Sequence, residues 1–180
     1  LSHDDLIDSY VFIDGDRSIA PDFLTTVNAA LSKAHVISGE TIIDMKNLGP
    51  VDRVKAAYQK YHMNFIRKAR SLFGLASQAD SGVFIIKQEI VKQIGDVDFK
   101  DINTELKYSL LLSKIKFKCT YNPNIQTVVD SANYIFRKPR LSYRLNLFKN
   151  CIPELFSTNF TFTEHALSLL CPNIWLVLII

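Results

Sequence analysis

Short strand-like runs and helical patterns alternate along most of the chain, and this alternation constrains the fold more than any other feature. Runs rich in β-branched and aromatic residues, each short enough for a buried strand, occur at 10–13, 35–39, 81–86 and 116–121. Apolar residues recur with helical spacing at 21–34, 50–73, 87–95 and 102–114. Strands that alternate with helices favour an α/β fold, a layered sheet with helices on its faces.

Local signals indicate where several of these elements begin and end. Pro50 is a natural first residue for the longest helix, which we expect to end near Gly74. Asp101 can cap the helix that follows it. Pro123 is expected to lie just beyond the last strand.

The composition is that of a folded domain. At 180 residues, with 48% hydrophobic and 22% charged residues, the chain can bury one sizeable core and forms one domain or a large part of one. Its net charge of +3 is too small to indicate nucleic-acid binding by itself. Cys119, Cys151 and Cys171 are odd in number and widely spaced, which argues against a disulfide framework and a zinc cluster. We therefore expect a reducing compartment.

Two aspartates, Asp14 and Asp16, directly follow the first strand and are separated by Gly15. With a helix starting near Pro21, they would lie at the carboxyl end of a strand, where open α/β sheets bind ligands. Carboxylates two residues apart in a bend can face one hard cation. Asp-Gly is also a common turn dipeptide, so these residues alone leave a cation site and a plain acidic turn open.

A segment that begins near Asn133 combines aromatic residues and leucines with cations. The cations are Arg137, Lys138, Arg140, Arg144 and Lys149. An apolar helix face bordered by basic residues is typical of a helix lying on a membrane surface. A nucleic-acid surface of aromatics interleaved with arginines is the alternative, and the low net charge disfavours it.

The run from Ala166 to Ile180 contains no charged residue. It is shorter than the roughly 18 to 20 apolar residues that cross a bilayer, and it is still apolar where the sequence stops. We interpret it as the start of a transmembrane segment in a longer membrane protein. A buried terminal helix or strand of a soluble domain is the alternative, because apolar runs of this length are often core.

Three pieces of sequence occur in a fixed order. They are Asp14-Gly15-Asp16 after a strand, an acid within "DINTELKYSLLL", and "RKPRL" ahead of the apolar tail. With these pieces the chain, from about Tyr10 to Phe148, resembles the membrane-embedded family 2 glycosyltransferases, which include chitin, hyaluronan and cellulose synthases. That family carries a DxD motif, a later TED motif and a (Q/R)xxRW motif.

The resemblance implies a partial α/β domain of the GT-A type, with a mixed sheet and helices on both faces. It implies a catalytic domain at 1–130 that lacks its first part, an amphipathic interfacial region at 131–165, and the start of a transmembrane segment at 166–180. The catalytic domain would lie on the cytoplasmic side of a membrane and bind no nucleic acid.

The resemblance also implies a donor site. Asp14 and Asp16 would hold Mg²⁺ or Mn²⁺ on the diphosphate of a nucleotide sugar, expected to be UDP-linked, where a hard cation neutralises the leaving charge. Arg137 and Arg140 would bind the same diphosphate as fork donors. Leu141 stands where the family has a tryptophan beside the acceptor sugar. At this position the resemblance therefore does not extend to how the acceptor is bound or to polymer extension.

An acceptor site is implied by two further similarities. "HVISGET" and "SLFGLASQADSGVF" are similar to stretches of chitin synthase-like members, the second of which lies near the acceptor. Asp80, Ser81 and Gly82 are therefore candidates for the pocket of a carbohydrate or lipid-linked acceptor. A plain loop entering a strand is the alternative for these three residues.

The second motif departs from the family. In a register without gaps, Glu105 takes the place of the family's aspartate base, whereas a shift by one residue would put Leu106 there. An inserted residue would rotate the rest of the helix by about 100°, so we prefer Glu105. The resemblance then implies transfer of a sugar with inversion, and polysaccharide synthesis as the process that this transfer serves. A catalytically inactive relative, or a membrane-associated interaction module, is the alternative that the changes at 105 and 141 suggest.

Overall fold

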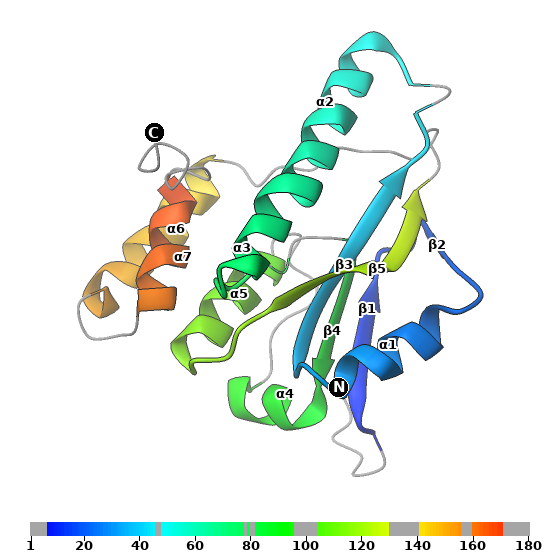
Figure 1. Cartoon of the computed structure of the whole chain (residues 1–180). Coiled ribbons are helices and arrows are strands. Elements are labelled where there is room, and N and C mark those ends of the chain that lie inside the picture. The colour runs from blue at the N-terminus through cyan, green and yellow to red at the C-terminus, as the bar shows by residue number, and fades with distance from the viewer. Residues whose placement is uncertain are drawn as a thin grey trace.

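The computed structural model describes residues 7–45, 48–77, 79, 82–95, 104–129, 141–155 and 160–170, with the backbone alone at 62–63, 104–105 and 141. Its centre is a five-stranded sheet with the order β1-β4-β3-β5-β2 (Figure 1). The strands are β1 (Ser9–Ile13), β2 (Arg17–Ile19), β3 (Val36–Ile43), β4 (Val83–Lys87) and β5 (Thr120–Val129). β3 and β5 pair in parallel and the other neighbours are antiparallel, so the expected mixed sheet is confirmed.

The helices follow the expected alternation. They are α1 (Phe23–Leu31), α2 (Pro50–Tyr61), α3 (Lys68–Leu72), α4 (Gln88–Ile94), α5 (Thr104–Lys114), α6 (Leu141–Cys151) and α7 (Phe160–Leu170), with a π-helical segment η1 (His62–Arg67) and a 3-10 turn η3 (Ile152–Glu154). α2, η1 and α3 form one continuous helical run, as predicted from Pro50 to the residues before Gly74. Gly74 and Gly95 have φ of 67° and 81°, and these left-handed conformations end the helices before them.

Helices cover both faces of the sheet. The evidence is that alternate residues of β4, which point to opposite faces, belong to different hydrophobic clusters. Phe84 and Ile86 pack with residues of α4 and α5, whereas Val83 and Ile85 pack with Phe23 of α1. The clusters also include Ile90, Val91, Tyr108 and Leu112 on the first face, and Val27, Ile37 and Ile125 on the second. The predicted α/β layering is therefore confirmed.

A third cluster joins the last two helices to this body. Phe162, Ala166 and Leu169 of α7 pack with Leu110 of α5 and with Cys151 at the end of α6. Figure 1 shows the α6–α7 pair, in yellow to red, at one side of the sheet. α7 runs across the boundary at 165 and 166 that the sequence suggested, and the tail from 171 lies outside the described residues. Among the helices that the structure describes, none combines the length and the apolar character needed to cross a bilayer.

Two strand ends differ from the sequence expectation. β3 continues past Gly39, and β5 starts later than residue 116 and contains Pro123. The register of the two strands shifts between Ser38 and Glu40, which marks a bulge. At this bulge a Cβ added to Gly39 would collide with the carbonyl oxygen of Ile125. Gly39 therefore permits the close approach of the two backbones, and does not end the strand.

Candidate functional site

The turn after β1 brings the two aspartates beside Gly82. β1 and β4 are antiparallel, so Ile13 at the end of one strand pairs with Val83 at the start of the other. The backbone N–H of Asp14 donates to the carbonyl of Gly82 at 3.2 Å. β1 and β2 are the two edge strands of the described sheet, and the predicted metal ligands lie in the turn between them, next to one predicted acceptor residue.

Arg17 connects the two carboxylates. Its Nη2 lies 3.3 Å from Oδ2 of Asp14, and its Nε lies 3.2 Å from Oδ1 of Asp16. The side chain of Arg17 is only 11% exposed, whereas those of Asp14 and Asp16 are 54% and 37% exposed. Both carboxylates therefore converge on one positive charge from the solvent side.

Arg17 was not predicted as a site residue from the sequence, although it directly follows the second aspartate. A cation beside a DxD sequence is the signal that could have identified it. Its partners depend on the turn that folds residues 14–17 back on themselves, in which the N–H of Arg17 donates to the carbonyl of Asp14 at 3.1 Å.

Gly82 makes room for this guanidinium. A Cβ added to Gly82 would lie 2.6 Å from both Cζ and Nε of Arg17, closer than real Cβ contacts allow. Any side chain at 82 must therefore displace Arg17. The contact gives Gly82 a concrete role in the geometry of the site.

The two aspartates could supply some of the oxygen ligands of a divalent cation. Their oxygens meet at a common cation, here the guanidinium of Arg17, which demonstrates that both can face one charge. A hard cation takes about six oxygen ligands, and a diphosphate and water would supply the rest. Within the described ranges, no group of three or more His, Cys, Asp or Glu side chains comes together to hold a metal ion.

For the remaining predicted site residues, the structure does not describe the side chains. Asp80, Ser81, Arg137 and Arg140 lie outside the described residues. Glu105 is the second residue of α5, and only its backbone is described. The functional roles assigned to all of these residues stay predictions.

One solved structure with this architecture is the mannosyltransferase PcManGT from Pyrobaculum calidifontis, in complex with GDP-mannose and Mn²⁺. The similarity has a TM-score of 0.54 at 13% sequence identity, and covers 93% of this chain and 46% of that one. The chain therefore has a glycosyltransferase fold. It spans less than half the length of that mannosyltransferase. The sequence matches no protein-family model and no curated protein.

In this glycosyltransferase fold, a buried polar network fixes α5 against the loop that precedes Gly82. The N–H of Ala79 donates to Oγ of Ser109 at 2.9 Å. The hydroxyl of Ser113 donates to the carbonyl of Ser109, and it lies 2.9 Å from Nδ1 of His165. Nδ1 also lies 3.2 Å from the Ser109 carbonyl. These partners assign the proton to Nδ1, and burial lowers the pKa of His165, so the ring is held neutral.

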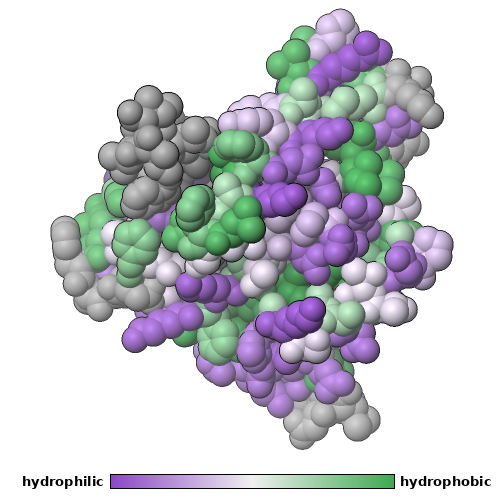
Figure 2. All heavy atoms as spheres, in the orientation of Figure 1, coloured by the Kyte–Doolittle hydropathy of each residue, from purple (hydrophilic) through white to green (hydrophobic). Residues whose placement is uncertain are grey.

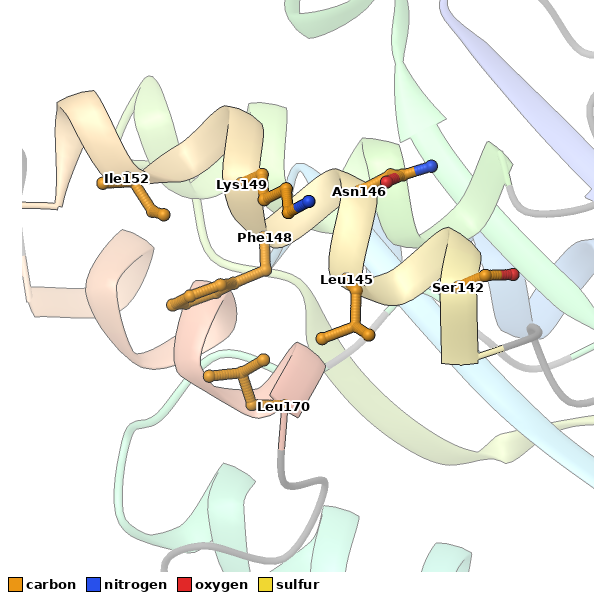
Figure 3. Close-up of a pocket in the computed structure, with 7 residues that line it drawn as sticks. All are labelled: Ser142, Leu145, Asn146, Phe148, Lys149, Ile152 and Leu170. Carbon is orange, nitrogen blue, oxygen red and sulfur yellow. The ribbon is translucent and has the colours of Figure 1, made fainter.

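A cavity of about 450 Å³ is lined by residues of α6, η3 and α7 (Figure 3). Figure 1 shows α6 and α7 on the other side of the molecule from β1 and β2, which flank the aspartates. The lining residues of the cavity are Ser142, Leu145, Asn146, Phe148, Lys149, Ile152 and Leu170. Figure 3 shows the side chains of Leu145, Phe148 and Leu170 pointing toward one another. The lining is mainly apolar with one lysine, which suits an apolar ligand or surface better than a sugar.

Proposed function

We propose that the chain is the catalytic part of a family 2 glycosyltransferase that moves a sugar from a nucleotide-sugar donor to an acceptor hydroxyl at a membrane. The observation that carries this proposal is the convergence of Asp14 and Asp16 on one cationic point, beside Gly82, in a glycosyltransferase fold. PcManGT, which has a similar fold, is seen with GDP-mannose and Mn²⁺. This supports a nucleotide-sugar donor and a divalent cation.

In the proposed donor site, Asp14 and Asp16 would hold Mg²⁺ or Mn²⁺. The bound cation would neutralise the charge that develops on the leaving diphosphate. Arg137 and Arg140 would contact the diphosphate oxygens through their guanidinium forks. Because the donor is proposed to be UDP-linked and the similar structure holds GDP-mannose, both nucleotides belong in the assay.

The proposed acceptor site is formed by Glu105 with Asp80, Ser81 and Gly82. Glu105 would take the proton of the acceptor hydroxyl as that oxygen attacks the anomeric carbon, which gives inversion in one displacement. Its position in the first turn of α5 favours the ionised form that a base requires, because a helix N-terminus stabilises negative charge. The acceptor is proposed to be a carbohydrate or a lipid-linked sugar.

The proposed membrane contact is supported by apolar surface on two parts of the molecule. Leu145, Ile152 and Leu170 are exposed around the α6–α7 cavity, where Lys149 adds a positive charge. A second apolar stripe runs along α2, η1 and α3 and consists of Val51, Val54, Tyr58, Tyr61, Phe65, Leu72 and Phe73. Figure 2 shows hydrophobic and hydrophilic surface side by side over α2 and α3. Apolar surface bordered by cations suits a lipid headgroup region.

The domain limits and the location belong to the same proposal. Residues 1–130 would form the catalytic domain on the cytoplasmic side, 131–165 the interfacial region, and 166–180 the start of a transmembrane segment. A full-length protein that leaves membranes during an alkaline carbonate wash would contradict the membrane part of the proposal. The wash does not test the chemistry of the donor site.

An inactive relative is the second candidate function. The observation in its favour is that Arg17 already forms ion pairs with both Asp14 and Asp16. A transfer assay separates the two candidates. Full-length protein in membranes is incubated with radiolabelled UDP-sugars or GDP-mannose, with Mn²⁺ or with EDTA, beside the variant Asp16→Ala. Metal-dependent transfer that Asp16→Ala abolishes supports the enzyme, and equal signals from both proteins would reject it.

A further inference from the structure

Arg17 contacts both of the carboxylates that would hold the proposed cation. Its guanidinium lies within 3.3 Å of both and is mostly buried behind them, against Gly82. A divalent cation held by the same oxygens would lie within a few ångströms of the guanidinium. Two positive charges at such a distance repel each other, although the exposure of the two carboxylates to solvent screens part of this repulsion. The cation and Arg17 therefore compete for the two aspartates.

A further feature suggests what would remove this competition. Nη1 of Arg17 is buried, and it has no hydrogen-bond partner among the described residues. A buried guanidinium nitrogen without a partner is costly, so an acceptor supplied by a ligand would be favourable here. The planar fork of arginine matches phosphate oxygens in geometry and charge. A diphosphate beside Asp14 and Asp16 would give Arg17 a new anionic partner.

We propose that Arg17 makes divalent-cation binding at Asp14 and Asp16 depend on a nucleotide diphosphate. Without the diphosphate, Arg17 neutralises the aspartates and weakens their affinity for the cation. With it, the guanidinium pairs with a phosphate oxygen and the carboxylates become free to bind the cation. This inference rests on the proposed function, since it concerns the same donor site, and it adds the order in which the components bind.

The proposal gives Gly82 a part in cation binding. The absence of a Cβ lets the guanidinium lie between the loop and the aspartates, where it can reach both of them. Its burial against Gly82 keeps Arg17 paired with the aspartates in the absence of ligand.

The test measures Mn²⁺ binding to purified full-length protein, with the free aqueous ion followed by electron paramagnetic resonance. Wild type, Arg17→Met and Arg17→Lys are compared with no nucleotide, with UDP and with GDP. Arg53→Met, which removes an exposed arginine of α2, is the matched control. Circular dichroism spectra and unfolding curves establish that each variant is folded.

We expect wild type and Arg53→Met to bind Mn²⁺ weakly alone, and at least about 10-fold more tightly with a nucleoside diphosphate. Arg17→Met should bind Mn²⁺ without nucleotide at least about 10-fold more tightly than wild type, because the competing charge is gone. Arg17→Lys keeps the charge and should resemble wild type without nucleotide. If Arg17→Met does not fold, the nucleotide dependence of Mn²⁺ binding to wild type still tests the diphosphate step.

Equal Mn²⁺ affinities of wild type and Arg17→Met in the absence of nucleotide would overturn the competition. An Arg17→Lys variant that binds Mn²⁺ as tightly as Arg17→Met would overturn it as well. A wild-type affinity that neither nucleotide changes would overturn the diphosphate step. None of these readings uses sugar transfer, so a failure of the proposed enzymatic function is detected separately in the transfer assay.

Discussion

Arg70 and Glu164 form a two-pronged ion pair that joins α3 to α7, with Nη1 2.5 Å from Oε1 and Nη2 2.8 Å from Oε2. Glu164 is 1% exposed, so this charge is held inside the protein. Arg70 also donates from Nε and Nη2 to the carbonyl of Ala76, at 2.9 and 2.7 Å. One guanidinium thus ties the last described helix to the loop that leads toward Gly82.

Glu164→Gln should destabilise the protein by about 3–5 kcal/mol, because it leaves the charge of Arg70 without its buried partner. Urea unfolding of wild type and variant measures the difference. Glu154→Gln is the matched control, since Glu154 pairs with Lys114 at 2.8 Å on the exposed surface. The control should change stability by less than about 1 kcal/mol. Similar losses of unfolding free energy in both variants would show that the buried ion pair stabilises the protein no more than the exposed one.

The His165 network predicts how stability depends on pH. Burial lowers the pKa of His165 below its ordinary value of 6.5, so at acid pH the unfolded chain binds a proton more readily than the folded one does. The contribution of this histidine is present above pH 6.5 and is lost as the pH falls toward the folded-state pKa. Unfolding free energies measured between neutral and mildly acid pH should decrease accordingly. Glu164 and Arg70 also face the ring, with opposite effects on its pKa.

His165→Gln should make that pH dependence shallower, because one proton-binding difference between the two states is removed. His35→Gln is the control, since its imidazole is about half exposed and lies 3.3 Å from Glu89. The comparison is made on the slope against pH, which a general loss of packing would not change. An unchanged slope in His165→Gln would contradict the assignment.

Gly82→Ala should cost up to about 1 kcal/mol of stability, because its Cβ would overlap the guanidinium of Arg17 and force it from the two partly exposed aspartates. Thermal or urea unfolding gives the difference. Gly15→Ala, in the same turn region, is a close control because a Cβ there meets nothing within 4 Å. If both alanines are equally tolerated, Arg17 can leave its position without cost and Gly82 has no part in holding it.

Much of this fold could be predicted from sequence because its signals are local. The strand at 10–13, the helix from Pro50 and the helix ends at Gly74 and Gly95 depend on residues within a few positions of one another. β5 could not be located correctly in this way. Pro123 signals the end of a strand locally, yet it lies at a bulge that exists only because β3 runs alongside.

The position of the two aspartates directly after a strand could be predicted from sequence, whereas their contacts could not. Asp14 and Asp16 were identified by their spacing after a strand, but their pairing with Arg17 requires the turn that brings all three together. The polar interior of α7 is a similar case. Glu164 and His165 look like surface residues in the sequence, and only the arrangement of α3, α5 and α7 shows that they are buried.

The prediction for Glu105 tests the proposed chemistry most directly. A glutamine is nearly equal in size but cannot accept the proton of an acceptor hydroxyl. In full-length protein, Glu105→Gln should therefore reduce sugar transfer by at least about 10²-fold, the usual scale of general base catalysis. Binding of the nucleotide and Mn²⁺ should change little, because the base does not contact the diphosphate in the proposed arrangement. Initial rates at saturating donor measure the first quantity, and the Mn²⁺ titration measures the second.

Glu105→Asp sharpens the test by keeping the carboxylate and shortening its stem. It should retain much more activity than Glu105→Gln if the pocket tolerates the shorter acid, because aspartate still supplies a carboxylate that can accept the proton. Lys107→Gln, which changes a charge one half-turn further along α5, serves as the control and should leave the rate close to that of wild type. Transfer by Glu105→Gln at the wild-type rate would remove Glu105 from the mechanism. The register that places Leu106 at this position, or an inactive relative, would then have to replace it.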